Sequence, residues 1–361
     1  MSTFWHSLSE LDSKEMVKEK MISVGLVGYG FAGRVFHAPI ISTIAGLNLC
    51  AIVQRKGDDA LRVYPTVTQV RSVEELLRMP EIQLVVVATP NTSHYSLAKQ
   101  CLIAGKDVVV DKPFTTTYAE AKELVDLASQ HGRLLTVYQN RRFDGDFRTI
   151  SNLLAEYRLG RIVLFESHFD RYRLEPRAGA WRELPEAGSG IFFDLGVHLL
   201  DQALLLFGTP SAVTADIRIE RQGGQVDDAF DVLLHYPRMR ALLRASMIAL
   251  APDLRFLVRG ENAAYVKHGI DPQEEVLKRG EVPGGGSWGK EQQESWGVLQ
   301  SVNGAERVET EAGDYRLFYQ NVRDTILGKS QIAVTHEQML NVMHGVELAR
   351  RSSEERRTVK W

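Results

Sequence analysis

The fold is decided near the start of the chain, by residues 21–37, "MISVGLVGYGFAGRVFH". A run of small apolar residues ends in three glycines at positions 28, 30 and 33, and an amphipathic pattern follows. A strand that leads through G-x-G-x-x-G into a helix is typical of a dinucleotide-binding turn, because each glycine lets backbone, phosphate or helix approach closely. The alternative is a plain strand-to-helix turn. We predict that the cofactor is bound by Gly28, Tyr29, Gly30, Phe31, Ala32 and Gly33.

Strands and helices alternate from this turn to about residue 140. The strands that we expect are short and apolar on both faces, a pattern typical of a parallel sheet covered by helices. They are "ISVGLVG" (22–28), "LNLCAIVQ" (47–54), "IQLVVVATP" (82–90), "KDVVV" (106–110) and "LLTVYQN" (134–140). Helices are expected at 72–78, 93–105 and 117–132. Residues 21–140 are therefore predicted to form a doubly wound parallel sheet of the Rossmann type.

The remaining residues, 141–361, follow a different pattern. The stretch "VTADIRIE" (213–220) alternates apolar and polar residues, which indicates a strand buried on one face only. Four more strand patterns follow, with breaks too short for crossover helices: "AFDVLLHY", "ALLRASMIA", "LRFLVRG" and "AAYVK". We therefore expect an α/β domain with an open, mainly antiparallel sheet. It would end in helices near 315–327 and 335–354 that can pack back on the first domain.

Length and composition agree with an ordinary globular protein that binds small molecules. The 361 residues suggest about two domains. A net charge of -3 and the lack of an apolar run of membrane-spanning length argue against nucleic acid and membrane partners. Cys50 and Cys101 lie in apolar runs and are interpreted as reduced thiols, which favours a cytoplasmic location. Residues 1–20 are expected to form an exposed arm.

The end of the second strand bears on the choice of cofactor. A domain that prefers NAD usually places an acid there to accept hydrogen bonds from the ribose hydroxyls. This chain has Gln54, Arg55 and Lys56 instead, and two cations suit a ribose 2'-phosphate. The sequence favours NADP over NAD. The alternative is that Arg55 and Lys56 are simply solvated residues at a strand end.

Two further motifs carry reactive groups. Lys112, in "KDVVVDKPF", follows a buried strand at the sheet edge where ligands bind, and Pro113 holds it extended. The apolar helix "GSGIFFDLGVHLLDQALLLFG" (188–208) has Ser189 as a candidate N-cap and Gly208 as its end. On it a polar stripe repeats at i, i+4, i+7 and i+8, formed by Asp194, His198, Asp201 and Gln202.

That stripe has three interpretations. It can face solvent, hold a metal ion or provide a catalytic Asp–His pair. No third and fourth ligand stand at recognisable spacing, so no metal is expected. The catalytic pair of Asp194 and His198 is the preferred interpretation.

Four motifs in order resemble the glucose-fructose oxidoreductase and inositol dehydrogenase (Gfo/Idh/MocA) family of NAD(P)-dependent oxidoreductases. They are "GYGFAG" (28–33), "ATPNTSH" (88–94), "DKPF" (111–114), with Asp111 where the family usually has Glu, and "DLGVHLLD" (194–201). The resemblance covers nearly the whole chain after Met21. The stretches "YQNRRFDGDF", "FDRYR", "GIDPQEE" and "WGKE" are similar to the branch that contains NADP-dependent scyllo-inositol dehydrogenases.

The resemblance implies roles for particular residues. The loop residues at the nicotinamide side of the cofactor would be Thr89, Pro90, Asn91, His94 and Asp111. Lys112 would lie beside the reacting oxygen and, with Asp194 and His198, complete a catalytic triad. Neutral His198 would take the hydroxyl proton, with Asp194 orienting its imidazole, so oxidation should speed up with pH through an ionisation in the neutral to mildly alkaline range. The open sheet implies a homodimer or higher homo-oligomer.

The substrate is expected to be a polyol or a sugar. Aromatic faces and forked donors suit hydroxyl-rich molecules, and the candidates are Tyr138, Arg142, Tyr172, Trp181 and Arg182. Because Asp144, Asp170 and Asp194 would oppose an anion, we expect ring hydroxyls and no phosphate or carboxylate, with scyllo-inositol as the first example. The alternatives are a related dehydrogenase acting on an aldose or sugar derivative, and a non-catalytic NADP-sensing protein.

Overall fold

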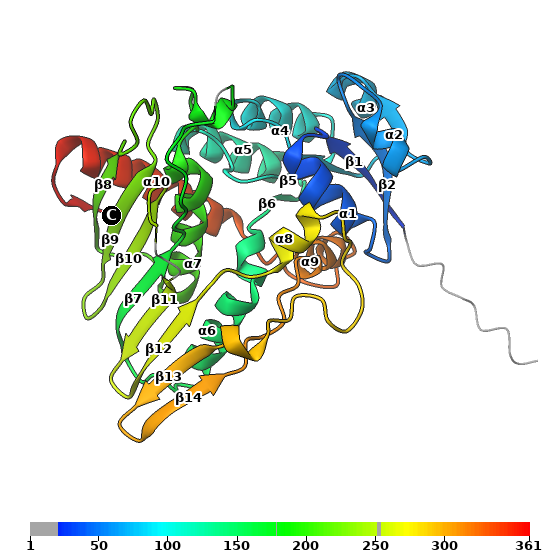
Figure 1. The fold of residues 1–361 in the computed structure, drawn as a ribbon. Coiled ribbons are helices and arrows are strands. Elements are labelled where there is room, and N and C mark those ends of the chain that lie inside the picture. The colour runs from blue at the N-terminus through cyan, green and yellow to red at the C-terminus, as the bar shows by residue number, and fades with distance from the viewer. Residues whose placement is uncertain (1–20, 178, 251–253) are drawn as a thin grey trace, which may run out of the picture.

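The computed structural model describes residues 21–177, 179–250 and 254–361. The expected arm, residues 1–20, lies outside them. Figure 1 shows two sheets side by side, each with helices against it. This is the α/β architecture expected from the sequence, with one parallel and one mainly antiparallel sheet.

The first sheet has six parallel strands in the order β3-β2-β1-β4-β5-β6. Their bounds are β1 Ile22–Val27, β2 Leu47–Val53, β3 Thr68–Val70, β4 Leu84–Val87, β5 Asp107–Val110 and β6 Leu135–Val137. This is the Rossmann strand order, in which chain direction across the sheet reverses between β1 and β4. All four residues of β4 are buried, as expected for a strand covered on both faces.

Helices cover this sheet on both sides. After β1 the chain is helical from residue 31 to residue 41, with a π-helical segment at Gly33–His37 and α1 at Ala38–Ile41. The other helices are α2 Asp59–Val63, α3 Val73–Leu77, α4 His94–Ile103 and α5 Tyr118–His131. A capping box of Thr117 and Glu120 fixes the start of α5, because each side chain bonds the other residue's backbone N–H.

The second sheet has nine strands in the order β14-β13-β12-β11-β7-β10-β9-β8-β15. Their bounds are β7 Ile162–His168, β8 Ala212–Arg218, β9 Ala229–His235, β10 Arg240–Ser246, β11 Leu254–Gly260, β12 Ala263–His268, β13 Gly297–Ser301, β14 Gly304–Val308 and β15 Val359–Lys360. Among the strands that the structure describes in this sheet, only the central β7–β10 pair is parallel, so the expectation of a mainly antiparallel sheet is confirmed.

Helices of the second half lie between the two sheets and along their ends (Figure 1). They are α6 Gly145–Ala155, α7 Val197–Phe207, α8 Gln273–Lys278, α9 Arg316–Ile326 and α10 His336–Glu355. Short 3-10 turns occur at Asn91–Ser93, Asn140–Phe143, Trp181–Glu183 and Gln293–Ser295. The long helix α10 contacts α5 and β6 as well as α7 and β8, so it joins the two halves of the molecule.

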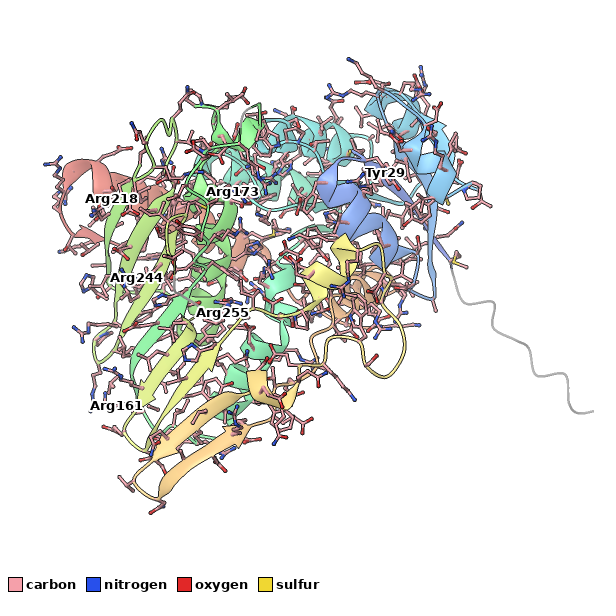
Figure 2. The ribbon with its side chains drawn as sticks, viewed as in Figure 1. Tyr29, Arg161, Arg173, Arg218, Arg244 and Arg255 are labelled. Atoms are coloured by element: carbon pink, nitrogen blue, oxygen red, sulfur yellow. The ribbon has the colours of Figure 1, made fainter. Side chains whose placement is uncertain are left out.

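The two faces of the nine-stranded sheet differ. Figure 2 shows Arg161, Arg218 and Arg244 on the side away from the first sheet, where each forms an ion pair near solvent. Arg255 lies on the opposite side, is almost fully buried, and pairs with buried Asp146 at 3.1 Å. The face toward the first sheet is therefore the one that can enclose a site.

Some local predictions need correction. Ser189 does not cap the helix that precedes α7, because its hydroxyl donates to the carbonyl of Trp181 at 3.3 Å and Ile191 occupies the cap position. Gly208 does end α7, with a φ of 70°.

Both cysteines are free, Cys101 buried and Cys50 half-buried. Among the described residues, none of the helices combines the length and apolar character needed to cross a membrane.

Candidate active site

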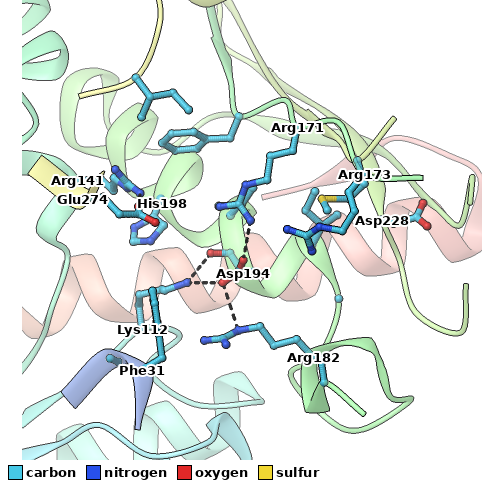
Figure 3. A pocket seen from close by; sticks show the side chains of 18 of the residues that line it. Phe31, Lys112, Arg141, Arg171, Arg173, Arg182, Asp194, His198, Asp228 and Glu274 are labelled. Carbon is cyan, nitrogen blue, oxygen red and sulfur yellow. Dashed lines mark hydrogen bonds and ion pairs between the residues drawn. The ribbon is translucent and has the colours of Figure 1, made fainter. Parts of the chain in front are cut away.

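A cavity of about 890 Å³ lies between the two sheets, at the edge where the parallel strands end. Its walls come from both halves of the chain. The first half contributes Phe31, Ala32, Asp111 and Lys112, and the second contributes the loop after β7, the π-helical segment Phe192–Gly196 and α8 (Figure 3). Ligands of open α/β sheets bind at this edge, so the cavity is the candidate active site.

Lys112 connects the two halves at the centre of the cavity. It follows β5, and its peptide bond to Pro113 is cis. Its Nζ donates to the carbonyl oxygen of Asp194 at 2.6 Å and to Oδ1 of the same residue at 2.8 Å. The ammonium is thereby held over the cavity, where it can face a substrate oxygen.

Asp194 stands among three cations. Besides Lys112, Arg182 approaches its Oδ1 at 3.5 Å and Arg171 approaches its Oδ2 at 3.6 Å (Figure 3). Burial alone would raise the pKa of Asp194, but the charges of Lys112, Arg182 and Arg171 outweigh it and hold the pKa far below its ordinary value. The carboxylate is therefore ionised at any pH at which the protein works.

His198 lies one helical turn after Asp194 and lines the same cavity. Burial, followed by the charges of Lys112 and Arg141, lowers the pKa of His198 well below its ordinary value. The imidazole is therefore neutral at pH 7 and able to accept a proton. Burial, together with the surrounding cations, lowers the pKa of His198, which argues against the expected ionisation in the neutral to mildly alkaline range.

The expected contact between Asp194 and His198 is not formed. The Asp194 carboxylate is engaged by cations, and Nδ1 of His198 is buried with no hydrogen-bond partner in the described part of the chain. Asp194 therefore positions Lys112 and not the imidazole. Sequence spacing placed the two residues on one helix face but gave no information on what each would contact.

The other half of the predicted polar stripe is structural. Asp201 accepts hydrogen bonds from Nε and Nη2 of Arg142 at 2.7 and 2.6 Å, in a fully buried pair. Gln202 donates to the carbonyl of Arg141 at 2.9 Å and accepts from Arg255 at 3.0 Å. Arg142 is not among the residues that line the cavity, so the structure does not support its expected contact with substrate.

The remaining substrate candidates divide. Tyr138 is buried and lines the cavity, and its hydroxyl has no partner among the described residues. Trp181 and Arg182 also line it, with the guanidinium 4.5 Å from the indole centre. Tyr172 does not line the cavity: its side chain is half exposed and its backbone pairs with Ile248, so its contact with substrate has no support in the structure.

The glycine turn fits a dinucleotide. Gly28 has a φ of 102°, and a Cβ there would lie 2.5 Å from the carbonyl oxygen of Ala88. A Cβ on Gly33 would lie 2.1 Å from the carbonyl oxygen of Gly28, so strand and helix touch at that point. Gly30 has nothing within 4 Å of its would-be Cβ and faces open space. The first and third glycines are thus needed for packing, and the second leaves the backbone open to a pyrophosphate.

The end of β2 carries the two cations expected for a phosphate. Arg55 and Lys56 are exposed, and neither forms an ion pair with a described residue. Gln54 is buried and has another role: it donates to Asp59 at 3.1 Å and accepts from the backbone N–H of Ala60 at 3.0 Å. Gln54 shapes the loop on which the two cations stand.

The loop after β4 is braced by buried hydrogen bonds. The two ring nitrogens of His94 lie 2.8 Å from the carbonyl of Pro113 and 2.9 Å from that of Thr89, and burial lowers the pKa of His94. Asn91 donates to the carbonyl of Gly188 at 2.6 Å. His94 and Asn91 therefore fix the strand ends and the Lys112 loop, while Thr89 and Pro90 stay on the surface side of that loop. Asp111 lines the cavity and lies 3.6 Å from His37.

Most of the charge in the cavity comes from residues that the sequence motifs did not indicate. Arg171, Arg173 and Arg177 line it from the loop after β7, and Arg141 and Glu274 form an ion pair on its other side. The motif "FDRYR" contains a signal for two of these residues. Its two arginines stand at i and i+2, and such side chains point to the same side of an extended segment. Within the described residues, no group of three or more His, Cys, Asp or Glu is placed to hold a metal ion.

The acids expected to repel an anion are not where the sequence suggested. Asp144 is fully buried, accepts from the hydroxyl of Tyr315 at 2.8 Å, and does not line the cavity. Asp170 accepts from the backbone N–H of Ser246 at 3.0 Å and also does not line it. Only Asp194 of the three faces the cavity, and cations surround it. The positions of these three acids therefore give no ground for excluding a phosphate or a carboxylate on the substrate.

A Rossmann sheet with a glycine-rich turn, beside a cavity that holds Lys112, Asp194 and His198, defines the class of nicotinamide-dinucleotide oxidoreductases. Comparison with known proteins agrees. Residues 22–139 match the oxidoreductase family, NAD-binding Rossmann fold, and residues 152–361 match the oxidoreductase family, C-terminal alpha/beta domain. The chain belongs to the Gfo/Idh/MocA family of NAD(P)-binding oxidoreductases.

Individual relatives cover almost the whole chain. It is 45% identical over 342 residues to the uncharacterized oxidoreductase YdgJ of Escherichia coli, covering 94% of this chain and 98% of that one. It is 36% identical over 346 residues to the scyllo-inositol 2-dehydrogenase (NADP(+)) IolW of Bacillus subtilis, covering 95% and 96%. The solved structure of the oxidoreductase yvaA from Bacillus subtilis superimposes with a TM-score of 0.92 at 36% identity, covering 95% and 99%.

Proposed function

We propose that this protein is an NADP-dependent oxidoreductase that oxidises a secondary alcohol of a cyclitol or sugar, or reduces the corresponding ketone. The observation that carries the proposal is the meeting of Lys112, Asp194 and His198 in one cavity, next to the open side of the glycine turn. Similarity to a scyllo-inositol 2-dehydrogenase supports a polyol as substrate.

Each residue has a part that follows from its surroundings. A nicotinamide dinucleotide held at the glycine turn would supply the hydride chemistry. Lys112, held by Asp194, donates a hydrogen bond to the substrate oxygen and stabilises the negative charge that develops on it. His198 is neutral because of burial and neighbouring cations, so its imidazole accepts the hydroxyl proton during oxidation. In the reverse direction the same imidazole returns the proton.

NADP is the proposed cofactor because of the end of β2. Arg55 and Lys56 are exposed cations that have no acidic partner in the described chain. They stand at the strand end, where a domain that prefers NAD usually has a carboxylate. Guanidinium and ammonium groups bind a 2'-phosphate well. We also propose residues 21–140 and 141–361 as the nucleotide-binding and substrate-binding domains, the second forming homo-oligomers, and a cytoplasmic location.

The test is turnover of a panel of cyclitols and aldoses with NADP and with NAD, followed by the absorbance of the reduced nicotinamide. We expect oxidation of at least one polyol with NADP. Lys112→Met should reduce kcat by at least about a hundredfold and change cofactor affinity only a few-fold, because its contact is made with the reacting oxygen. If Lys112→Met retains full activity, or no polyol or sugar is turned over, the proposal is wrong.

A further inference from the structure

Four arginines gather on one side of the candidate active site. Arg171, Arg173 and Arg177 come from the loop after β7, and Arg182 comes from the 3-10 turn Trp181–Glu183. The backbone N–H groups of Arg171 and Arg173 donate to the carbonyls of Ser246 and Met247 at 2.8 and 2.7 Å. The segment is thus fixed to the end of β10, and the two guanidinium groups point into the cavity from an ordered strand-like stretch (Figure 3).

These guanidinium groups have donors to spare. Within the described residues, the side chains of Arg171, Arg173 and Arg182 donate no hydrogen bond. Their nitrogens lie 3.5 to 3.9 Å from carboxylate oxygens, which is too far for one. A guanidinium has five N–H donors, so a cavity with several of them unbonded is built to receive acceptors. Their positions leave those donors free for a ligand.

The acids nearby are already occupied. Asp194 accepts its short hydrogen bonds from Lys112. Glu183 accepts from Arg221 at 2.6 Å, and Asp228 accepts from the same guanidinium at 2.9 Å. Among the described residues, Arg173 has only Glu183 within ion-pair range, at 3.9 Å, and shares it with Arg221. With Asp227, four carboxylates on this side of the cavity face the four arginines together with Arg221 and Lys112, so this side carries more positive than negative charge.

The repulsion between these arginines affects the pKa of Arg173. Burial, then the charges of Arg177 and Arg171, lowers the pKa of Arg173 below its ordinary value, and Glu183 only partly opposes them. Like charges that are held together and share too few counter-ions cost free energy, and a negatively charged ligand would relieve that cost.

The geometry points to a substrate that carries an anionic group, a carboxylate or a phosphate, on its polyol ring, held by Arg171, Arg173 and Arg177 while the reacting hydroxyl meets Lys112 and His198. This inference rests on the proposed function and specifies its substrate class. Arg171 lies 3.6 Å from Oδ2 of Asp194 and Lys112 lies 2.8 Å from Oδ1 of the same carboxylate, so the arginine group and the reacting centre lie within the reach of one sugar ring. A neutral polyol would leave the excess charge unbalanced.

The test compares molecules that differ only in charge, using the NADP-loaded protein. D-glucose, D-glucuronate and D-glucose 6-phosphate are measured as substrates and, by calorimetry, as ligands. We expect tighter binding and a higher kcat/KM for at least one of the two anions than for glucose, and the better anion identifies the group as carboxylate or phosphate. Equal or weaker binding of both anions overturns the inference.

Variants locate the effect. Arg173→Gln should weaken anion binding by about ten- to a hundredfold, because a charge-assisted hydrogen bond is lost, and change glucose binding less than about threefold. Arg177→Gln, which removes an exposed side chain of the same group, should act in the same direction and covers the case in which Arg173→Gln does not fold. The matched control is Arg240→Gln on β10, an exposed arginine outside the cavity, which should change neither.

Binding and turnover separate the two proposals. Arginine-dependent anion binding without oxidation of any compound would support the anion site and refute the proposed reaction. Oxidation of neutral polyols, with anions neither bound nor inhibitory, would support the reaction and refute the anion site. Equal losses for glucose and for the anions in Arg173→Gln would also refute it, since the arginine would then only maintain the cavity.

Discussion

Replacement of Arg142 by methionine separates a structural role from a substrate role. Arg142 donates four hydrogen bonds: two to Asp201 at 2.7 and 2.6 Å, one to the carbonyl of Ala333 at 2.7 Å and one to Gln338 at 2.9 Å. Both side chains of the ion pair are about 95% buried or more. The pair links the segment after β6 to α7 and to the start of α10.

The cost of the substitution follows from what it leaves behind. Methionine fills much of the arginine stem but leaves the Asp201 carboxylate buried without a counter-ion, which typically costs about 3–5 kcal/mol. For a cooperative unit of about 150–250 residues, this loss of stability corresponds to a fall in Tm of roughly 6–20 °C. Adding Asp201→Asn to the variant removes the stranded charge, so the double variant should be more stable than Arg142→Met alone.

The assay is thermal unfolding followed by circular dichroism, together with kcat and KM at a temperature where the variant is folded. Arg62→Met is the control, because its ion pair with Asp59 is exposed and such pairs contribute about 0–1 kcal/mol. An Arg142→Met protein with native Tm and a strongly raised KM would refute the structural assignment. It would return Arg142 to the substrate residues.

Three other outcomes are expected. Arg55→Asp should weaken NADP binding and improve NAD binding, since a carboxylate repels the 2'-phosphate but accepts from a free hydroxyl, and titration of both cofactors checks this; equal, unchanged affinities would leave Arg55 a solvated strand end. Gly30→Ala should fold normally yet bind cofactor more weakly, whereas Gly33→Ala should unfold at lower temperature, because only its Cβ meets backbone; the reverse order would contradict the described turn. The oxidation rate should rise with pH only below about 6.5, the ordinary pKa of histidine, and be flat above it, because the pKa of His198 is lowered and only its neutral form accepts a proton; a His198→Asn variant that kept the same acid limb would rule out this assignment.

Local patterns were sufficient for most of the first sheet. Its central strands are apolar on both faces, and the glycine turn has a spacing that few other structures require. The three-residue strand β3, Thr68–Val70, was missed because it is short, at the sheet edge and half exposed. The strand β7, Ile162–His168, was missed although it is central, because its half-buried start lacks a regular alternation.

The site was less predictable because its contacts are far apart in sequence. Lys112 and Asp194 were named from motifs, but the hydrogen bond between them spans 82 residues. Arg142 was named as a substrate residue and Arg171 was not, because the sequence shows only that both carry a guanidinium group. What distinguishes them is the partner each meets: Asp201 for Arg142, and an open cavity for Arg171. Only the packing of distant segments decides that.

The place of β15 in the nine-stranded sheet bears on how the protein is made. Val359–Lys360 pairs with β8, whose other neighbour β9 is close in sequence. During synthesis the first sheet has all its strands once about residue 140 has left the ribosome, and N-terminal units generally fold first. The edge of β8 at Ala212 and Val213, by contrast, stays unpaired until residues 359 and 360 have been made. An exposed strand edge is a template for pairing with other chains, so a chain cut short before residue 359 should self-associate there more readily than the full chain.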